Sequence, residues 1–180
     1  RGFNRLILFL GADHYGYIDR LKAAAEVLGI GKDNLDIIIM QLVKLFENSQ
    51  EVRMSKRTGV YVAIDELIDE VGLDAARYFF LNRDSDSHLN FNLEQAKEQS
   101  DNNPVYYVQY AYARICSILR KSGKPQFSIF NFQSNPNFQL LKHESELNLI
   151  KKLIQFPEIV EDITKDYQVQ RLPQYSMDLA

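Results

Sequence analysis

A basic loop carries the residue types best suited to chemistry on phosphates. Its sequence is Arg53-Met54-Ser55-Lys56-Arg57-Thr58-Gly59, in which three cations and two hydroxyls precede a glycine. When a triphosphate loses pyrophosphate, negative charge builds on the leaving oxygens, and ammonium, guanidinium, hydroxyl and backbone N–H groups can stabilise it. We therefore predict that Lys56 is catalytic. Taken alone, a short basic cluster is also typical of a solvated surface or a simple nucleic-acid contact.

The sequence on either side of this loop predicts elements that would hold it. Before the loop, residues 35–46 are mainly apolar, and their β-branched first half is typical of a parallel strand buried on both faces. Residues 47–50 then favour a turn, so that a hairpin leads into the loop. After the loop, residues 64–71 have the apolar spacing of an amphipathic helix, and a second, more apolar helix is predicted over residues 73–81.

A second group of polar residues follows the first apolar run. Residues 5–10 predict a strand. The chain then continues through Gly11, Asp13 and His14 into a helix predicted from Ile18 to Leu28. Open α/β sheets bind ligands at the carboxyl ends of their strands. Asp13 and His14 therefore offer an acceptor and a donor for a ribose hydroxyl or the polar head of a substrate. The alternative is that Asp13 only caps the helix.

A third group of candidate residues lies on a helix that Asn103 and Pro104 open, since proline is favoured in the first turn. The residues expected to face the core of the protein are Val105, Val108, Tyr112, Ile115 and Leu119. Another face carries Tyr107, Tyr110 and Arg114. Aromatic rings and cations together are suited to stack on and neutralise single-stranded or bent RNA. The alternative is that the tyrosines pack against another helix.

The composition is that of a soluble globular chain. Its 180 residues are 46% hydrophobic and 25% charged, and its apolar runs are too short to span a bilayer. A single cysteine, Cys116, rules out an internal disulfide and argues against a thiolate metal cluster. We therefore expect a cytoplasmic protein with no dedicated metal ligand. The net charge of −3 does not exclude binding to nucleic acid, because phosphate recognition depends on local clusters.

The predicted elements change in kind near residue 102. Before it strands alternate with helices, and after it helix signals dominate, so the fold class is α/β followed by all-α. We predict two domains, residues 1–101 and residues 102–180. Residue 1 falls beside the start of a strand and residue 180 falls within a predicted helix. We therefore expect the chain to be a segment of a longer protein.

Four motifs, taken in order and with their separations, resemble those of bacterial arginyl-tRNA synthetase, a class I aminoacyl-tRNA synthetase. They are residues 11–18, 53–59, 66–72 and 103–110. The resemblance implies that the first domain is the C-terminal end of a Rossmann-like class I catalytic domain. It implies that the second is a helical-bundle anticodon-binding domain, incomplete at its C-terminus. Two positions depart from the family pattern, since Arg53 replaces a usual Lys and Tyr15 replaces a frequent second His.

The resemblance also implies the activity and the site residues. The implied activity is ATP-dependent formation of arginyl-adenylate, in a step that depends on tRNA, and transfer of the arginyl group to tRNA(Arg). Arginine, ATP and this tRNA would be the partners, and Mg²⁺ would accompany ATP as part of the substrate. Lys56 would stabilise the leaving pyrophosphate. The residues implied to bind ATP are Gly11, Asp13, His14, Arg53, Met54, Ser55, Lys56 and Arg57. Those implied to bind tRNA are Tyr107, Tyr110 and Arg114.

The other signature of the class, an element of the His-Ile-Gly-His type, does not occur in the sequence. The upstream segment that supplies most of the arginine pocket is also missing. We therefore expect the segment alone to be inactive and to need the N-terminal catalytic half. Two alternative functions remain at this point, a non-catalytic tRNA-binding or RNA-binding module and another class I aminoacyl-tRNA synthetase.

Overall fold

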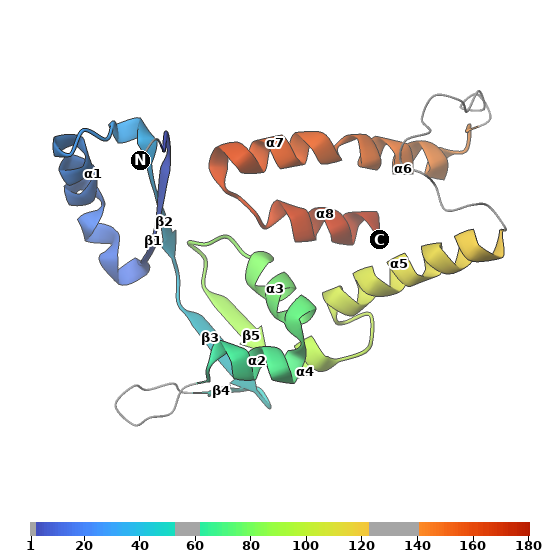
Figure 1. The fold of residues 1–180 in the computed structure, drawn as a ribbon. Helices are drawn as coiled ribbons and strands as arrows, with labels where there is room; N and C mark the ends of the chain where they lie inside the picture. The colour runs from blue at the N-terminus through green and yellow to red at the C-terminus, as the bar shows by residue number, and fades with distance from the viewer. Residues whose placement is uncertain (1–2, 53–61, 123–140) are drawn as a thin grey trace. The chain divides into compact units, whose positions relative to one another are not determined.

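The computed structural model describes residues 3–52, 62–122 and 141–180 (Figure 1). The chain divides into two compact units. The first, which we call the strand unit, comprises residues 1–67 and 83–94. The second, the helical unit, comprises residues 68–82 and 95–180. Each unit is described below by itself.

A parallel pair of strands opens the strand unit. Strand β1 (Leu6–Gly11) pairs with β2 (Leu35–Met40), with Leu6 opposite Leu35 and Gly11 opposite Met40. Parallel strands need a crossover connection. Here it is made by the 3-10 helix η1 (Ala12–Tyr17), the α-helix α1 (Ile18–Val27) and the short 3-10 helix η2 (Lys32–Asn34). The strand predicted at residues 5–10 and the helix predicted from Ile18 are confirmed.

The second sheet of this unit has the strand order β4-β3-β5. Strand β3 (Val43–Glu47) pairs antiparallel with β4 (Gln50–Val52) and parallel with β5 (Leu89–Asn92). Asn48 and Ser49 join β3 to β4 with φ angles of 49° and 63°, and tight hairpin turns favour such positive values. The hairpin predicted at residues 47–50 is therefore confirmed. The buried side chains of Leu45, Leu89 and Phe91 form the core of this sheet.

The expected burial of β2 on both faces is wrong. Ile39 is the buried residue of this strand, and in the neighbouring β1 the side chains of Ile7 and Phe9 are exposed. A parallel strand is buried on both faces only when helices cover both. Among the described residues, the contacts of this pair of strands with α-helices come mainly from α1. The apolar composition of residues 35–40 therefore predicted the strand correctly but not its burial.

Helices make up the rest of the described chain. Helix α2 (Ile64–Val71) and helix α3 (Leu73–Leu81) are separated by Gly72, whose φ of 84° is a value that favours glycine. Helix α4 (Leu93–Lys97) follows β5. The later helices are α5 (Pro104–Lys121), α6 (Glu144–Ile154), α7 (Phe156–Asp166) and α8 (Arg171–Leu179). No helix in the described ranges is both long and apolar enough to cross a membrane.

The helical unit is held together by contacts of α5 with α3 and α8, and of α6, α7 and α8 with one another. Ala75, Ala76 and Phe79 of α3 are buried. The Tyr78 hydroxyl donates a hydrogen bond of 3.0 Å to the carbonyl of Pro173 and so links α3 to α8. Burial raises the pKa of this hydroxyl above its ordinary value. The link therefore places a polar contact at a partly buried helix junction.

The core stripe predicted along α5 is correct only at its start. Val105 is buried and Val108 is half-buried, whereas Tyr112, Ile115 and Leu119 are exposed. The described contacts of α5 are mainly with α3 and α8. Helical periodicity shows that a face is apolar, but it does not show which turns of that face meet a neighbour. The prediction failed because it assigned one environment to all five residues.

Candidate functional site

Gly11, Asp13 and His14 lie together at the C-terminal end of β1, where η1 turns the chain away from the strand. Asp13 folds back toward Gly11, because a Cβ atom at position 11 would lie 2.6 Å from Asp13 Oδ1. On its other side, Asp13 Oδ2 lies 3.6 Å from His14 Nε2. A side chain at position 11 would displace the carboxylate. The structure thus brings these three candidate residues together at the strand edge where α/β proteins bind ligands.

The alternative role of Asp13 as a helix cap does not fit the structure. The N-cap of α1 is Tyr17 and that of η1 is Gly11, and neither helix start has a side-chain cap hydrogen bond. The side chain of Asp13 is 79% exposed and that of His14 is 54% exposed. Both polar groups can therefore reach a ligand.

Two further residues belong to this corner, and the sequence prediction missed them. The rings of His14 and Tyr17 meet edge to face, with centroids 5.7 Å apart. The guanidinium carbon of Arg20 lies 5.8 Å from the centroid of the Tyr17 ring. The signal that could have found them is the spacing of three residues, which aligns side chains in a 3-10 helix.

The predicted phosphate-binding loop lies outside the described residues. Its candidate residues are Arg53, Met54, Ser55, Lys56 and Arg57. Its two flanks are described. Val52 ends β4 opposite the buried Leu45, and the backbone N–H of Ala63 donates a 3.0 Å hydrogen bond to Glu66 Oε2 just before α2. A strand therefore leads into this segment and a helix follows it, as the sequence predicts.

The start of α5 is fixed by Asn103, a buried side chain with 5% exposure. Its Oδ1 accepts from the Val105 N–H at 3.0 Å, which caps the helix. Its Nδ2 donates to the carbonyls of Ala96 at 3.1 Å and Glu98 at 2.8 Å. The side-chain carboxylate of Glu98 accepts from the Ser100 hydroxyl and from Asn102, and these bonds lower its pKa. The segment before α5 is thus held by polar contacts.

The three candidate RNA-binding residues line one cavity of about 400 Å³ along α5. They are Tyr107, Tyr110 and Arg114. Arg114 lies over the Tyr110 ring, with its guanidinium carbon 5.8 Å from the centroid. Tyr110 also stacks on Tyr106, which the sequence prediction missed, at 6.2 Å and an interplanar angle of 11°. Tyr106, Tyr110 and Arg114 therefore form a row with the i, i+4 spacing of a helix face. At 48% exposure, the Tyr110 ring can meet a ligand.

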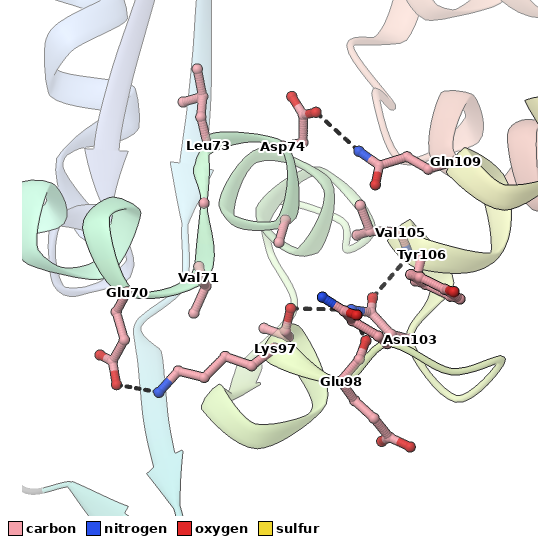
Figure 2. A pocket seen from close by; sticks show the side chains of 14 residues that line it. Glu70, Val71, Leu73, Asp74, Lys97, Glu98, Asn103, Val105, Tyr106 and Gln109 are labelled. Atoms are coloured by element: carbon pink, nitrogen blue, oxygen red, sulfur yellow. Dashed lines mark hydrogen bonds and ion pairs between the residues drawn. The ribbon is translucent and has the colours of Figure 1, made fainter. Parts of the chain in front are cut away.

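A second cavity, of about 500 Å³, lies in the helical unit beside the corner between α2 and α3, the end of α4 and the start of α5 (Figure 2). Its polar side chains largely pair with one another. Lys97 Nζ lies 2.5 Å from Glu70 Oε1, and Gln109 Nε2 donates to Asp74 Oδ2 at 3.0 Å. Because these groups satisfy each other, the cavity offers few directed contacts to a ligand.

No metal centre is indicated in the part of the chain that the structure describes. There, no group of three or more His, Cys, Asp or Glu side chains is arranged to hold an ion. The carboxylate and imidazole of Asp13 and His14 form a pair only.

Comparisons with known proteins agree on one family. Residues 108–180 match the family model described as the DALR anticodon binding domain. The whole chain aligns at 50% identity with an arginine–tRNA ligase of Desulforamulus reducens and at 47% with arginine–tRNA ligase 1 of Halalkalibacterium halodurans. The chain spans 32% of the length of each of these two relatives.

Solved structures show the same likeness in three dimensions. A crystal structure of an arginyl-tRNA synthetase from Campylobacter jejuni superposes with a TM-score of 0.83 at 33% identity, over 99% of this chain and 38% of that one. The Thermus thermophilus arginyl-tRNA synthetase shares the fold with a TM-score of 0.70, over 98% of this chain and 32% of that one, at 23% identity. The resemblance seen in the four motifs is confirmed. Over its whole length, this chain is a homologue of the C-terminal part of the bacterial arginyl-tRNA synthetases.

Proposed function

We propose that the protein containing this chain is an arginine–tRNA ligase, which activates arginine with ATP and transfers the arginyl group to tRNA(Arg). The observation that carries the proposal is the 50% identity, over the entire chain, with a relative named arginine–tRNA ligase. Residues 1–101 would be the end of a Rossmann-like class I catalytic domain, and residues 102–180 would belong to a helical anticodon-binding domain. The parallel unit β1-α1-β2 and the match at residues 108–180 support this division. We expect the protein to act in the cytoplasm, where tRNA is charged.

In the proposed reaction, the carboxylate of arginine attacks the α-phosphate of ATP and pyrophosphate leaves. Lys56 would stabilise the charge that grows on the leaving group, with help from Ser55 and from Arg53 or Arg57. Met54 would lie within the same loop. Mg²⁺ would enter with ATP as part of the substrate, and we assign no residue of this chain to it.

The corner at the end of β1 would hold a polar part of the substrates. Asp13 can accept a hydrogen bond from a ribose hydroxyl or from the amino group of arginine, and His14 can donate or accept one. The exposure of both side chains supports this role. Gly11 would serve the site by leaving room for the Asp13 carboxylate, since any Cβ atom there would collide with it.

The row on α5 would contact the tRNA. An unstacked base could stack beside Tyr110, while Arg114 would neutralise a neighbouring phosphate and Tyr107 would line the same cavity. Base–aromatic stacking contributes about 1–3 kcal/mol per base. Replacing Tyr110 by Ala should therefore weaken tRNA binding about tenfold, while arginine activation at saturating tRNA should remain unchanged. Equal tRNA affinity in the two proteins would remove Tyr110 from the interface.

The test of the proposed function is arginine-dependent exchange between ATP and pyrophosphate in the full-length protein, with tRNA(Arg) present because the family resemblance implies that activation depends on it. Removing one preorganised electrostatic donor costs about 3 kcal/mol, so Lys56→Ala should slow the exchange about 100-fold. The matched control is Lys44→Ala. Lys44 lies in the preceding hairpin and pairs with Glu51 at 3.3 Å, and loss of such an exposed pair should change little.

Two results would contradict the proposal. If the full-length protein shows no arginine-dependent exchange with tRNA(Arg) present, it is not an arginine–tRNA ligase. If Lys56→Ala exchanges as fast as the parent protein, Lys56 has no part in the mechanism. The 180-residue chain alone should form no adenylate, because it lacks the nucleotide signature of the class.

A further inference from the structure

Three side chains form a row on the turn that follows β1. They are His14, Tyr17 and Arg20, and each is three residues from the next. A 3-10 helix has three residues per turn, so side chains at positions i and i+3 lie one above the other. His14 and Tyr17 lie in η1, and Arg20 lies in the first turn of α1, where i and i+3 are again neighbours. The local helix type therefore creates the row.

Tyr17 is the central member of this row and contacts both of the others. The His14 and Tyr17 rings meet at 5.7 Å with an interplanar angle of 63°, an edge-to-face geometry that aromatic quadrupoles favour. Arg20 lies 5.8 Å from the Tyr17 centroid, within the range of a cation–π interaction. Tyr17 is itself 51% exposed. The ring is therefore held largely by these contacts rather than by a packed core.

His14 needs such a support if it is to act on a ligand. Its side chain is 54% exposed, and its neighbour Asp13 contacts it on one side only, at 3.6 Å. An exposed imidazole samples several rotamers, and fixing one of them on binding costs conformational entropy. A ring held in place before the ligand arrives avoids part of this cost.

We propose that Tyr17, held by Arg20, is a positioning residue that fixes the His14 imidazole beside Asp13 for contact with the substrate. This inference rests on the proposed function of the corner. Tyr17 would act through His14 and would not itself contact the reacting atoms. The ring, rather than its hydroxyl, would carry the effect, because the contacts with His14 and Arg20 are both made by the ring.

The first experiment measures ATP–pyrophosphate exchange in the full-length protein at saturating tRNA(Arg), with ATP and arginine varied in turn. His14→Ala identifies the substrate whose KM depends on the imidazole. Tyr17→Leu should raise the KM of that same substrate about threefold to tenfold, the range expected for an aromatic pair. Tyr17→Phe keeps the ring and should remain within about twofold of the parent protein. Unchanged thermal melting would show that the variants are folded.

A double-mutant cycle tests whether Tyr17 acts through His14. If it does, the combination of His14→Ala and Tyr17→Leu should be no worse than His14→Ala alone. Arg20→Met should raise the same KM by about twofold to fivefold, in line with an exposed cation–π pair. Lys22→Met is the matched control, because it removes a cation from the same helix at a position outside the row, and it should have no effect.

The outcomes separate the two proposals. If His14→Ala raises a KM and Tyr17→Leu does not, or if their penalties add, the positioning role is wrong and the substrate site stands. If His14→Ala leaves every kinetic constant unchanged, His14 does not contact a substrate, and both its own assignment and the positioning role of Tyr17 are wrong. The exchange activity of the parent protein and its loss in Lys56→Ala would still decide the overall function.

Discussion

Asp13 and Asn103 are both of residue types that commonly cap helices, yet the structure uses them differently. Asn103 is 5% exposed, caps α5 and donates to two further carbonyls. Asp13 has a side chain that is 79% exposed and caps neither η1 nor α1. The fold needs the side chain of Asn103, because its hydrogen bonds are made to backbone groups. The side chain of Asp13 caps neither neighbouring helix and is therefore available to bind a ligand.

The largest loss of stability is expected when Asn103 is replaced. Its replacement by Ala would leave the carbonyls of Ala96 and Glu98 and the N–H of Val105 without these partners in a buried place. Each such bond contributes about 1 kcal/mol, and unsatisfied buried groups cost more, so the free energy of unfolding should fall by about 2–4 kcal/mol. Urea unfolding followed by far-UV circular dichroism would measure the loss.

The control for Asn103 is its neighbour Asn102. This side chain is exposed and donates to Glu98 Oε1 at 3.0 Å, so Asn102→Ala should lower the free energy of unfolding by less than about 1 kcal/mol. If both variants lost the same stability, burial would not be what distinguishes a fold-stabilising cap from an exposed polar residue.

A smaller loss of stability is expected when the partly buried hydroxyl of Tyr78 is removed. Tyr78→Phe removes the hydrogen bond to the carbonyl of Pro173 between α3 and α8. A net hydrogen bond contributes about 1 kcal/mol, so the free energy of unfolding should fall by roughly that amount. Tyr112→Phe is the control, because Tyr112 is 71% exposed and should lose little. Equal losses would argue against a special role for the α3–α8 link.

The contrast between these residues shows which features a sequence can predict. Local signals predicted the helices well, because Gly72 and Pro104 act on the backbone at their own positions. The hairpin at Asn48 and Ser49 follows from the same kind of signal. Burial along α5 was predicted wrongly from Tyr112 onward, because burial depends on where distant helices meet it. Sequence signals at a residue therefore predict features that depend on its own backbone, such as helix ends and turns, but not features that depend on distant parts of the chain.

The contacts of the candidate site show the same limit. His14 and Tyr17 pair within the 3-10 turn at residues 12–17, where side chains three residues apart lie one above the other, and the sequence analysis did not predict this turn. Tyr106 was missed because its role depends on stacking with Tyr110, although their spacing of four residues contained the signal. The Asp13 carboxylate near Gly11 could not be predicted, because it depends on the backbone conformation at the end of β1.

A substitution of Gly11, at the corner after β1, should leave stability almost unchanged but should greatly reduce activity. Gly11→Ala would place a Cβ atom 2.6 Å from Asp13 Oδ1. The carboxylate is the end of an exposed side chain and can move, so stability should change by less than about 0.5 kcal/mol. ATP–pyrophosphate exchange should nevertheless fall, as it should in Asp13→Ala. Full activity in Gly11→Ala would show that the position of the carboxylate is unimportant.

The smallest effect concerns Glu98, whose side chain is exposed but bonded. The hydrogen bond from Ser100, followed by that from Asn102, lowers the pKa of Glu98 below its ordinary value of 4.5. Between the lowered pKa and 4.5 the unfolded chain binds more protons than the folded one. The stabilisation is therefore fully present above pH 4.5 and is lost as the pH falls through the lowered value. Glu98→Gln should consequently differ from the parent protein in its urea midpoint at pH 7, and this difference should shrink in acid. A difference that stayed constant with pH would mean that the charge of Glu98 contributes nothing to the stability of the segment before α5.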